Sequence, residues 1–431
     1  MRNRWPLLFL SCLLQWHSFW ASPAHGQFLT SLFPEGVPGY GDAARVTVQS
    51  RQRPLYEPLG IRLDTAMIRP LLSVSTGYDD NIFAGPKRRG SWEFATRPSV
   101  LIGAERSQGA FGLYLSADDI RYANQPSQNR TDGGGFIGTT MNVGRDRLTI
   151  GGGLLSRHQD RTELDALPSD KPVGFRVGNL RAAYDHEIGR TTVTPAVDLN
   201  LWRFDNTTIQ RLAVSQATRD RTTAQGGLTL RHAWMPAREL VIVTRLLETH
   251  YDHPAARLPS NNSTSLQVLG GIDYDDNTVW RYRLLAGAQH RAAASSAFAS
   301  QTVGVVESAV TWSPSGMTTI RAGLSRGIED AAQTGFSSFT FTSGTLTLDH
   351  ELFRNILLNA SATARWAVFN QSGAQQTGLA VGLGSTWLID RNFRLSVSYD
   401  VTDVRGSHLP VAAVAGNYIR DLALLTLRIG L

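Results

Sequence analysis

The sequence predicts an all-β protein, a transmembrane antiparallel up-and-down β-barrel of about 18 strands, with 16 as the other count that fits the pattern. Three observations predict this fold. Apolar and polar residues alternate along most of the chain, short and long connections alternate between the strands, and aromatic residues recur beside the short connections. Together they describe a sheet with one apolar face and one wet face.

The start of the chain has the composition of a secretory signal peptide. Two arginines precede an apolar run, and small residues surround Gly26. The run is short and interrupted by polar residues, so it makes a poor membrane span. Apolar residues continue past Cys12, the single cysteine, so a lipoprotein signal fits less well. We therefore expect residues 1–26 to be cleaved on export.

No later stretch approaches the roughly 18 to 20 consecutive apolar residues that a transmembrane helix needs, which excludes a helical bundle in the inner membrane. The net charge of +6 comes from single arginines spread along the chain. A basic patch for nucleic acid would be clustered, so no nucleic-acid partner is expected.

The alternation is clearest in residues 393–402, where Phe393, Leu395 and Val397 alternate with polar residues. One face of such a strand is apolar and the other is hydrated. The last strand places Leu425, Leu427, Ile429 and Leu431 on one face. It resembles the C-terminal signal strand read by the barrel-assembly machinery, although that signal more often ends in an aromatic residue.

Loop lengths give the second regularity. Tight connections such as "VGRDR" and "SPSGM" alternate with longer polar ones such as "NQPSQNRTDGG". Short periplasmic turns and long external loops are typical of outer-membrane barrels, and an even strand count places both termini in the periplasm. We predict a barrel over residues 71–431, preceded by a leader over residues 27–70. The leader either stays in the periplasm or folds into the lumen as a plug.

Aromatic residues beside the short turns are predicted to form a girdle at the periplasmic membrane interface. The alternative is that they are scattered sheet aromatics. The predicted girdle consists of Trp234, Trp280, Trp312, Phe353 and Trp387.

Alternation also predicts which polar residues face the lumen. Arginine there offers bidentate contacts to carboxylates. The alternative is an ordinary solvated wall without a ligand. The pore-lining candidates are Asp198, Asn200, Arg321, Ser325, Arg365, Arg394, Ser396, Asp400 and Arg428.

A pair of aspartates occurs twice in similar surroundings, in "GYDDNIF" at 77–83 and in "DYDDNTV" at 273–279. Strand parity places the first copy at the external rim and the second beside a periplasmic turn. A shared binding site is therefore not expected, and two adjacent carboxylates are too few ligands for calcium. We interpret both copies as polar rim or turn residues.

Several histidines lie near carboxylates, as in "DHEL" at 349–352 and "YDHP" at 251–254. No pair has the spacing of a helical zinc motif, and no serine, histidine and acid converge in the predicted layout. We predict no enzymatic activity, no metal and no cofactor. A structural or adhesive surface protein is also not expected, because it would need longer external loops. An enzyme acting on lipid or glycan at the rim of the barrel is a third hypothesis.

Residues 51–83 resemble the entry into the barrel of the outer-membrane β-barrel porin family that accompanies exopolysaccharide and capsule clusters in Proteobacteria. The resemblance implies an outer-membrane channel in a Gram-negative bacterium that exports a secreted polysaccharide, with lipid, the barrel-assembly machinery and periplasmic export components as partners. A general diffusion porin for small solutes is the alternative. The residues that carry the resemblance are Arg53, Pro54, Tyr56, Pro58, Gly60, Pro70, Tyr78, Asp79, Asp80, Asn81 and Ile82.

Overall fold

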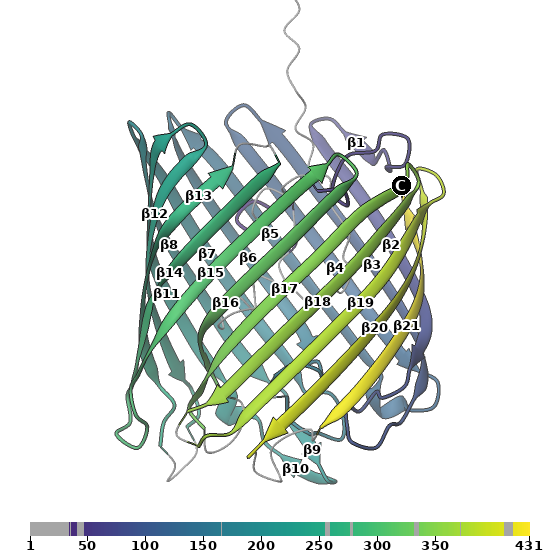
Figure 1. Cartoon of the computed structure of the whole chain (residues 1–431), viewed down its shortest axis with the longest axis vertical. Coiled ribbons are helices and arrows are strands. Elements are labelled where there is room, and N and C mark those ends of the chain that lie inside the picture. Colours follow the sequence, from purple (N-terminus) through teal and green to yellow (C-terminus); the bar gives the residue numbers. More distant parts are fainter. Residues whose placement is uncertain are drawn as a thin grey trace, which may run out of the picture.

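A computed structural model describes residues 34, 36–40, 47–164, 166–254, 259–275, 279–331, 336–370, 372–408 and 417–431. The predicted signal peptide lies outside these residues. The described chain forms one closed antiparallel barrel of 18 strands, as the sequence predicts (Figure 1). A short strand, β1, extends the same sheet at the edge of β2.

The barrel strands are β2–β8 and β11–β21, and each pairs with its sequence neighbour in the barrel. The first one begins at Ala66 and not at Leu71. The strands are β1 (Ile61–Leu63), β2 (Ala66–Asp79), β3 (Ser91–Arg106), β4 (Gly109–Tyr122), β5 (Arg130–Val143), β6 (Asp146–His158), β7 (Gly174–Ile188), β8 (Thr191–Phe204), β9 (Thr207–Ile209), β10 (Leu212–Val214), β11 (Arg221–Met235), β12 (Arg238–Tyr251), β13 (Ser263–Asp275), β14 (Trp280–Ala293), β15 (Gln301–Ser315), β16 (Thr318–Asp330), β17 (Ser338–Phe353), β18 (Ile356–Phe369), β19 (Gln375–Leu388), β20 (Phe393–Ser407) and β21 (Tyr418–Gly430).

The barrel closes between its first and last strands. β2 pairs with β21 in antiparallel register from Leu71 opposite Gly430 to Asp79 opposite Leu422. Closure matters because an open sheet edge in lipid would leave backbone polar groups without partners, at several kcal/mol each. We call the wall formed by β19, β20, β21, β2 and β3 the seam.

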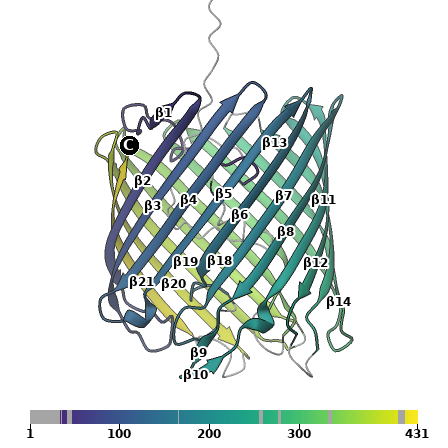
Figure 2. The ribbon, with the colours of Figure 1, turned by 180° about the vertical axis from the view of Figure 1, so that it is seen from behind.

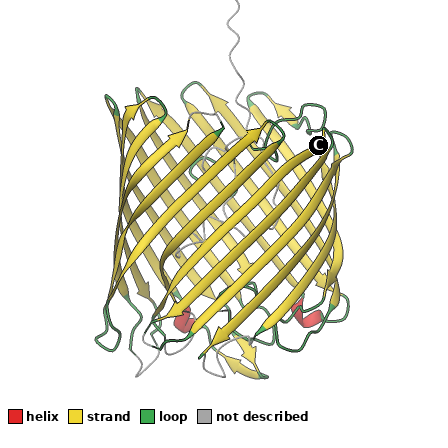
Figure 3. Ribbon diagram, in the orientation of Figure 1, coloured by secondary structure: helices red, strands yellow, loops and turns green. Residues whose placement is uncertain are grey.

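The two ends of the barrel differ in the same way as the predicted loops. Both β1 and the C-terminus lie at the end with the tight turns, and the longer loops lie at the other end, where the small β9–β10 hairpin projects (Figures 1 and 2). By the rule for outer-membrane barrels, the first end is periplasmic and the second is external. Outside the barrel wall the external loops hold two single-turn 3₁₀ helices, Pro126–Gln128 and Ala217–Arg219 (Figure 3).

The outer surface carries an apolar belt, as alternation predicts. On β21 the outward residue Leu425 is exposed, with Leu427 and Ile429 on the same face, and on β12 the outward residues Ile242 and Leu246 are exposed. The residues between them face inward. Exposed apolar rows of this kind fit a lipid environment, since each face of a strand repeats every second residue. No helix of the described residues is long and apolar enough to cross a membrane.

The five predicted girdle residues all lie at the periplasmic ends of strands or in the turn beside them. Trp234, Trp280, Phe353 and Trp387 are exposed on the outside, and Trp312 stacks on Trp280 with ring centroids 5.3 Å apart. These positions suit amphipathic rings at a membrane interface. Their anchoring role stays a prediction.

Candidate functional site in the lumen

All nine pore-lining candidates lie on the inward face of their strands. The alternation of buried and exposed residues along each strand shows this facing. Asp198 and Asn200 share the face of the buried Trp202 on β8, and Arg394, Ser396 and Asp400 share one face of β20. Arg428 lies opposite Arg394, and Ser325 and Arg321 lie on one face of β16. Arg365 on β18 pairs with the inward Ser343 of β17. Whether these residues line a conducting path stays a prediction.

Most inward charges occur as ion pairs between strands. Arg181 lies 3.1 Å from Asp198, and Arg321 lies 2.9 Å from Asp349, with Asp349 fully buried. Arg245 pairs with Glu307 across two intervening strands. Such pairs order the wall, while the hydrated lumen keeps their net energetic contribution modest. The lumen wall is therefore charged but locally balanced.

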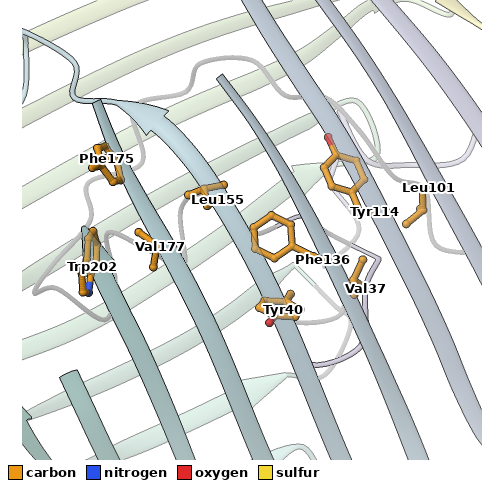
Figure 4. Close-up of a cluster of buried hydrophobic side chains, with 9 residues drawn as sticks. All are labelled: Val37, Tyr40, Leu101, Tyr114, Phe136, Leu155, Phe175, Val177 and Trp202. Atoms are coloured by element: carbon orange, nitrogen blue, oxygen red, sulfur yellow. The ribbon is translucent and has the colours of Figure 1, made fainter. Parts of the chain in front are cut away.

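The leader enters the lumen. Val37 and Tyr40 belong to a buried apolar cluster with inward side chains of β3 to β8, among them Tyr114 and Phe136 (Figure 4). The rings of Tyr40 and Phe136 pack edge to face at 5.1 Å. Arg181 lies over the Tyr40 ring and donates a 2.7 Å hydrogen bond to the carbonyl of Gly39.

Three glycines on the inward face of β4, β5 and β6 make room for this segment. A Cβ at Gly112 would lie 2.8 Å from the Pro38 ring, and one at Gly151 would lie 2.6 Å from the Tyr40 ring. A Cβ at Gly138 would overlap the carbonyl oxygen of Pro38. The leader backbone thus lies directly on the wall, where only glycine leaves space.

Farther along, the leader contacts the other side of the barrel near the periplasmic end. The amide of Val48 donates to the hydroxyl of Thr319 on β16 at 3.1 Å, and Val48 packs against Leu357 and Leu388. Arg51 and Arg53 both pair with Glu351 at the end of β17. Since β5 is the fourth barrel strand and β16 the thirteenth, the leader contacts walls that face each other.

An external loop also crosses the lumen. Residues 159–173 connect β6 to β7, and Leu164 in this loop packs against a buried cluster that includes Phe339 and Phe369 of β17 and β18. β6 and β7 are the fifth and sixth barrel strands, whereas β17 and β18 are the fourteenth and fifteenth. The loop therefore spans the external mouth. We call it the crossing loop.

Neighbouring loops hold the crossing loop in place. Arg161 donates two hydrogen bonds to the side-chain oxygen of Gln128, at 2.9 and 3.1 Å, and lies over the ring of Phe83. Asp170 accepts backbone hydrogen bonds from Gln210 and Arg211 between β9 and β10. These contacts involve three further external loops, so the crossing loop is an integrated part of the mouth.

Two carboxyl groups of the crossing loop have opposite protonation behaviour. Although burial opposes ionisation, Arg420 and Arg130, with hydrogen bonds from Thr162, lower the pKa of Asp160 to about 2. Burial and repulsion from Asp160 raise the pKa of Glu163 to about 8, against the attraction of Arg365. The Glu163 side chain is partly exposed despite its dense surroundings, so it can exchange protons with water in the lumen.

The net charge of the crossing loop should therefore change with pH. Glu163 is neutral well below pH 8 and gains a negative charge above it, whereas Asp160 stays ionised throughout. In ion-conducting wild-type barrels we expect cation selectivity to rise between pH 7 and pH 9. Glu163→Gln should remove that rise, as measured by reversal potentials in planar bilayers under a salt gradient. A rise that persists in Glu163→Gln would assign it to another group.

The first copy of the aspartate pair organises the external end of the seam. Asp79 is fully buried and accepts hydrogen bonds from Arg420 of β21 at 2.7 and 3.0 Å. Asn81, also fully buried, donates to the carbonyls of Gly85 and Ile419. Asp80 accepts from the backbone of Asp421. The motif therefore ties β2 to β21.

The second copy lies at the periplasmic end of β13, as strand parity predicts, with residues 276–278 outside the described part. Arg283 lies 3.9 Å from Asp273 there. The two copies are at opposite rims and form no common site. The rim assignment of the first copy holds, but sequence reasoning missed its buried pairing with Arg420.

The histidine-containing fragments are dispersed. His186 forms a hydrogen bond with Asp146, and His350 forms one with Thr318, both near periplasmic turns. His250 forms a hydrogen bond with Asn262 near an external loop. Among the described residues, no group of three or more histidine, cysteine or acidic side chains is arranged to hold a metal ion.

Sequence reasoning gave a plug in the lumen as one alternative for the leader, but it did not predict which leader residues contact the wall, and it missed the crossing loop. Val37, Tyr40, Asp160, Glu163 and Leu164 lie outside the strand alternation, so no periodic pattern marks them as inward. The Pro and Gly content of "FPEGVPGYG" and its single tyrosine were the available signal. Long-range contacts, such as those of Tyr40 with Phe136 and of Leu164 with the cluster on β17 and β18, determine where these segments lie.

A closed apolar-belted barrel with a charged lumen defines a membrane channel of the β-barrel class. The chain belongs to the family described as "Putative beta-barrel porin 2", whose model matches residues 53–429. It is thus an outer-membrane β-barrel porin. No curated protein matches the sequence.

Solved structures of outer-membrane porins resemble the chain in overall shape. OccK2 (OpdF) of Pseudomonas aeruginosa is 12% identical with a TM-score of 0.43, covering 84% of this chain and 98% of its own. The outer-membrane protein OpdK of the same species is 14% identical, TM-score 0.44, covering 84% and 98%. A BenF-like porin from Pseudomonas fluorescens Pf-5 is 10% identical, TM-score 0.46, covering 86% and 100%.

Proposed function

We propose that this porin is a gated conduit through which a secreted polysaccharide crosses the outer membrane. The observation that carries the proposal is the double obstruction of the lumen. The leader contacts facing walls near the periplasmic end, and the crossing loop spans the external mouth. A conduit wide enough for a polymer must be closed when idle, because barrels of this size otherwise leave an aqueous channel.

We assign the opening movement to the leader, because the crossing loop is bound to its neighbouring loops. The leader is held by a few hydrogen bonds, an ion-pair cluster at Glu351 and two apolar clusters, one around Val37 and Tyr40 and one around Val48. The proposed cleavage of residues 1–26 leaves the N-terminal end of the leader as the natural point for a periplasmic partner to pull. Synthesis and periplasmic components supply the driving force, since a barrel has no energy source of its own.

The alternative is a diffusion porin for small solutes. The crossing loop favours it, because a loop across the external mouth leaves less room for a polymer. In that case the leader and the crossing loop would act as a permanent filter. The two functions differ in cargo size, which cell experiments can separate.

A clean deletion of the gene tests the proposal. We expect extracellular polysaccharide to be lost and to accumulate in the periplasm, while uptake of small sugars is normal. Normal polymer with slowed uptake would establish the diffusion porin instead. A full-length copy in trans should restore export, which excludes effects on neighbouring genes.

Ion selectivity tests the assignment of the lumen face. Replacing Arg321, Arg365 or Arg394 singly by Glu should shift the reversal potential toward cations, because each change moves two charge units at the wall. Arg176→Glu is the matched control, since Arg176 lies on the outward face of β7 and is exposed. If none of the three inward variants differed from the control, the facing assignment or the conducting lumen would be wrong.

A further inference from the structure

Two arginines face each other where the barrel closes. Arg394 of β20 and Arg428 of β21 are direct cross-strand partners on the inward face, so two like charges stand opposite each other. Like charges placed directly opposite destabilise a sheet. An anion bound between the two guanidinium groups would offset this repulsion.

A row of hydroxyl groups lies beside the pair. In the next inward row, Thr386 lies opposite Ser396, Ser396 opposite Thr426, and Thr426 opposite Ser75. The Thr386 and Ser396 hydroxyls are 3.1 Å apart, and those of Ser75 and Thr426 are 2.9 Å apart. We call these four residues, with Ser73, Arg97, Arg394 and Arg428, the seam patch.

The third arginine extends the patch. Ser73 of β2 lies opposite both Arg428 and Arg97, so three guanidinium groups lie along one row of four adjacent strands. Arg97 donates to the hydroxyl of Ser75 and pairs with Asp118. The two rows of the patch are two residues apart, about 7 Å at the usual rise of a strand. This spacing is on the scale of one sugar ring.

The leader already places a carbonyl oxygen and a carboxylate beside the arginines of the patch. Arg394 donates a 2.9 Å hydrogen bond to the carbonyl of Tyr56, and the carboxylate of Glu57 attracts Arg394. The positive charge of Arg53 repels that of Arg394. Carbonyl and carboxylate oxygens of the leader thus stand beside the guanidinium where an external anion would bind.

We propose that the seam patch binds carboxylate-bearing saccharides, with the carboxylate held by Arg394 and Arg428 and the ring hydroxyls by the serine and threonine row. The inference rests on the proposed function, because it assumes that saccharides enter the lumen. Guanidinium groups recognise carboxylates through paired, charge-assisted hydrogen bonds, and adjacent hydroxyls suit a polyol. The bound uronate takes the place of Tyr56 and Glu57, so ligand and leader compete.

Binding of trigalacturonate to the full-length protein in detergent, measured by calorimetry, tests the proposal. The wild-type protein should bind trigalacturonate at least about tenfold more tightly than maltotriose, a neutral trisaccharide, and more tightly than acetate, which lacks hydroxyls. Arg394→Gln and Arg428→Gln should each weaken trigalacturonate binding about tenfold. Arg245→Gln, an inward arginine on the far wall, is the matched control and should bind like wild type.

A variant of the leader separates loss of binding from damage to the barrel. Glu57→Gln removes the competing carboxylate and should tighten trigalacturonate binding several-fold, a change that an unfolded barrel cannot produce. Equal binding of trigalacturonate and maltotriose by wild type, or equal losses in Arg394→Gln and Arg245→Gln, would overturn the proposal.

The cell assay keeps this inference separate from the proposed function. Loss of exported polymer in the deletion strain with no trigalacturonate binding would reject the seam patch and leave the export role standing. Specific binding together with unchanged polymer export would support the patch as a saccharide site and reject the export role.

Discussion

Gly138→Val is expected to raise the single-channel conductance several-fold. A Cβ at Gly138 would overlap the carbonyl oxygen of Pro38, so valine and the leader cannot occupy this part of the wall together. Valine is otherwise favoured in a strand, so the barrel should still assemble. The leader would then leave the wall of β4 to β6, and an 18-stranded barrel without it has room for an aqueous path.

Gly152→Val is the matched control. Gly152 lies on the adjacent strand β6 but on the outward face, where a Cβ would meet only the Asn179 carbonyl at 3.9 Å. Its conductance should equal that of wild type in the same planar bilayers. Removal of residues 36–40 should reproduce the effect of Gly138→Val. If neither Gly138→Val nor the deletion conducts more than wild type, the leader does not obstruct the ion path.

Asp79→Ala is expected to lower the free energy of unfolding by about 3 to 5 kcal/mol. Asp79 is fully buried, and its removal leaves the largely buried guanidinium of Arg420 without its main partner. The backbone amide of Asn81 also loses its acceptor. The attraction between Arg420 and Asp160 softens the loss, which places the effect toward the lower end of this range. The pairing between β2 and β21 should open first, because this ion pair joins those two strands.

The measurement is denaturant unfolding in lipid vesicles, with Asp119→Ala as the control. Asp119 pairs with Arg121 near the same rim, but both side chains lie on the outward face and are exposed. Exposed pairs contribute about 0 to 1 kcal/mol, so the control should unfold almost like wild type. Similar destabilisation by both substitutions would mean that the buried pair with Arg420 does not secure the seam.

The strand pattern could be predicted because each barrel strand is decided locally. One face meets lipid and the other meets water, so period-two alternation in residues such as 393–402 reports both the strand and its faces. The same parity assigned all nine lining candidates to the inward face and the two aspartate motifs to opposite rims. The boundary at Ala66 was less accessible, since "TAMIRP" does not show a strict alternation.

The positions of the leader and the crossing loop in the lumen could not be predicted from strand alternation. Glu163 and Leu164 belong to a polar loop, and their inward position depends on contacts with β17 and β18, nearly two hundred residues later. Val37 and Tyr40 lie in a turn-rich leader whose place depends on glycines in three strands. The inward charge of Asp79 was readable from parity, but its partner Arg420 was not.

The sequence by itself predicted the membrane-spanning barrel, a count of about 18 strands with 16 as the alternative, the facing of its strands, and the end at which its C-terminus lies. These properties follow from one repeated local choice between lipid and water. Only the tertiary structure decided what fills the lumen and which charges meet there. Closure of the sheet brings β2 against β21, and with it Asp79 to Arg420 and Ser73 to Arg428. The leader and the crossing loop reach the lumen through long-range packing, which no periodicity in the sequence records.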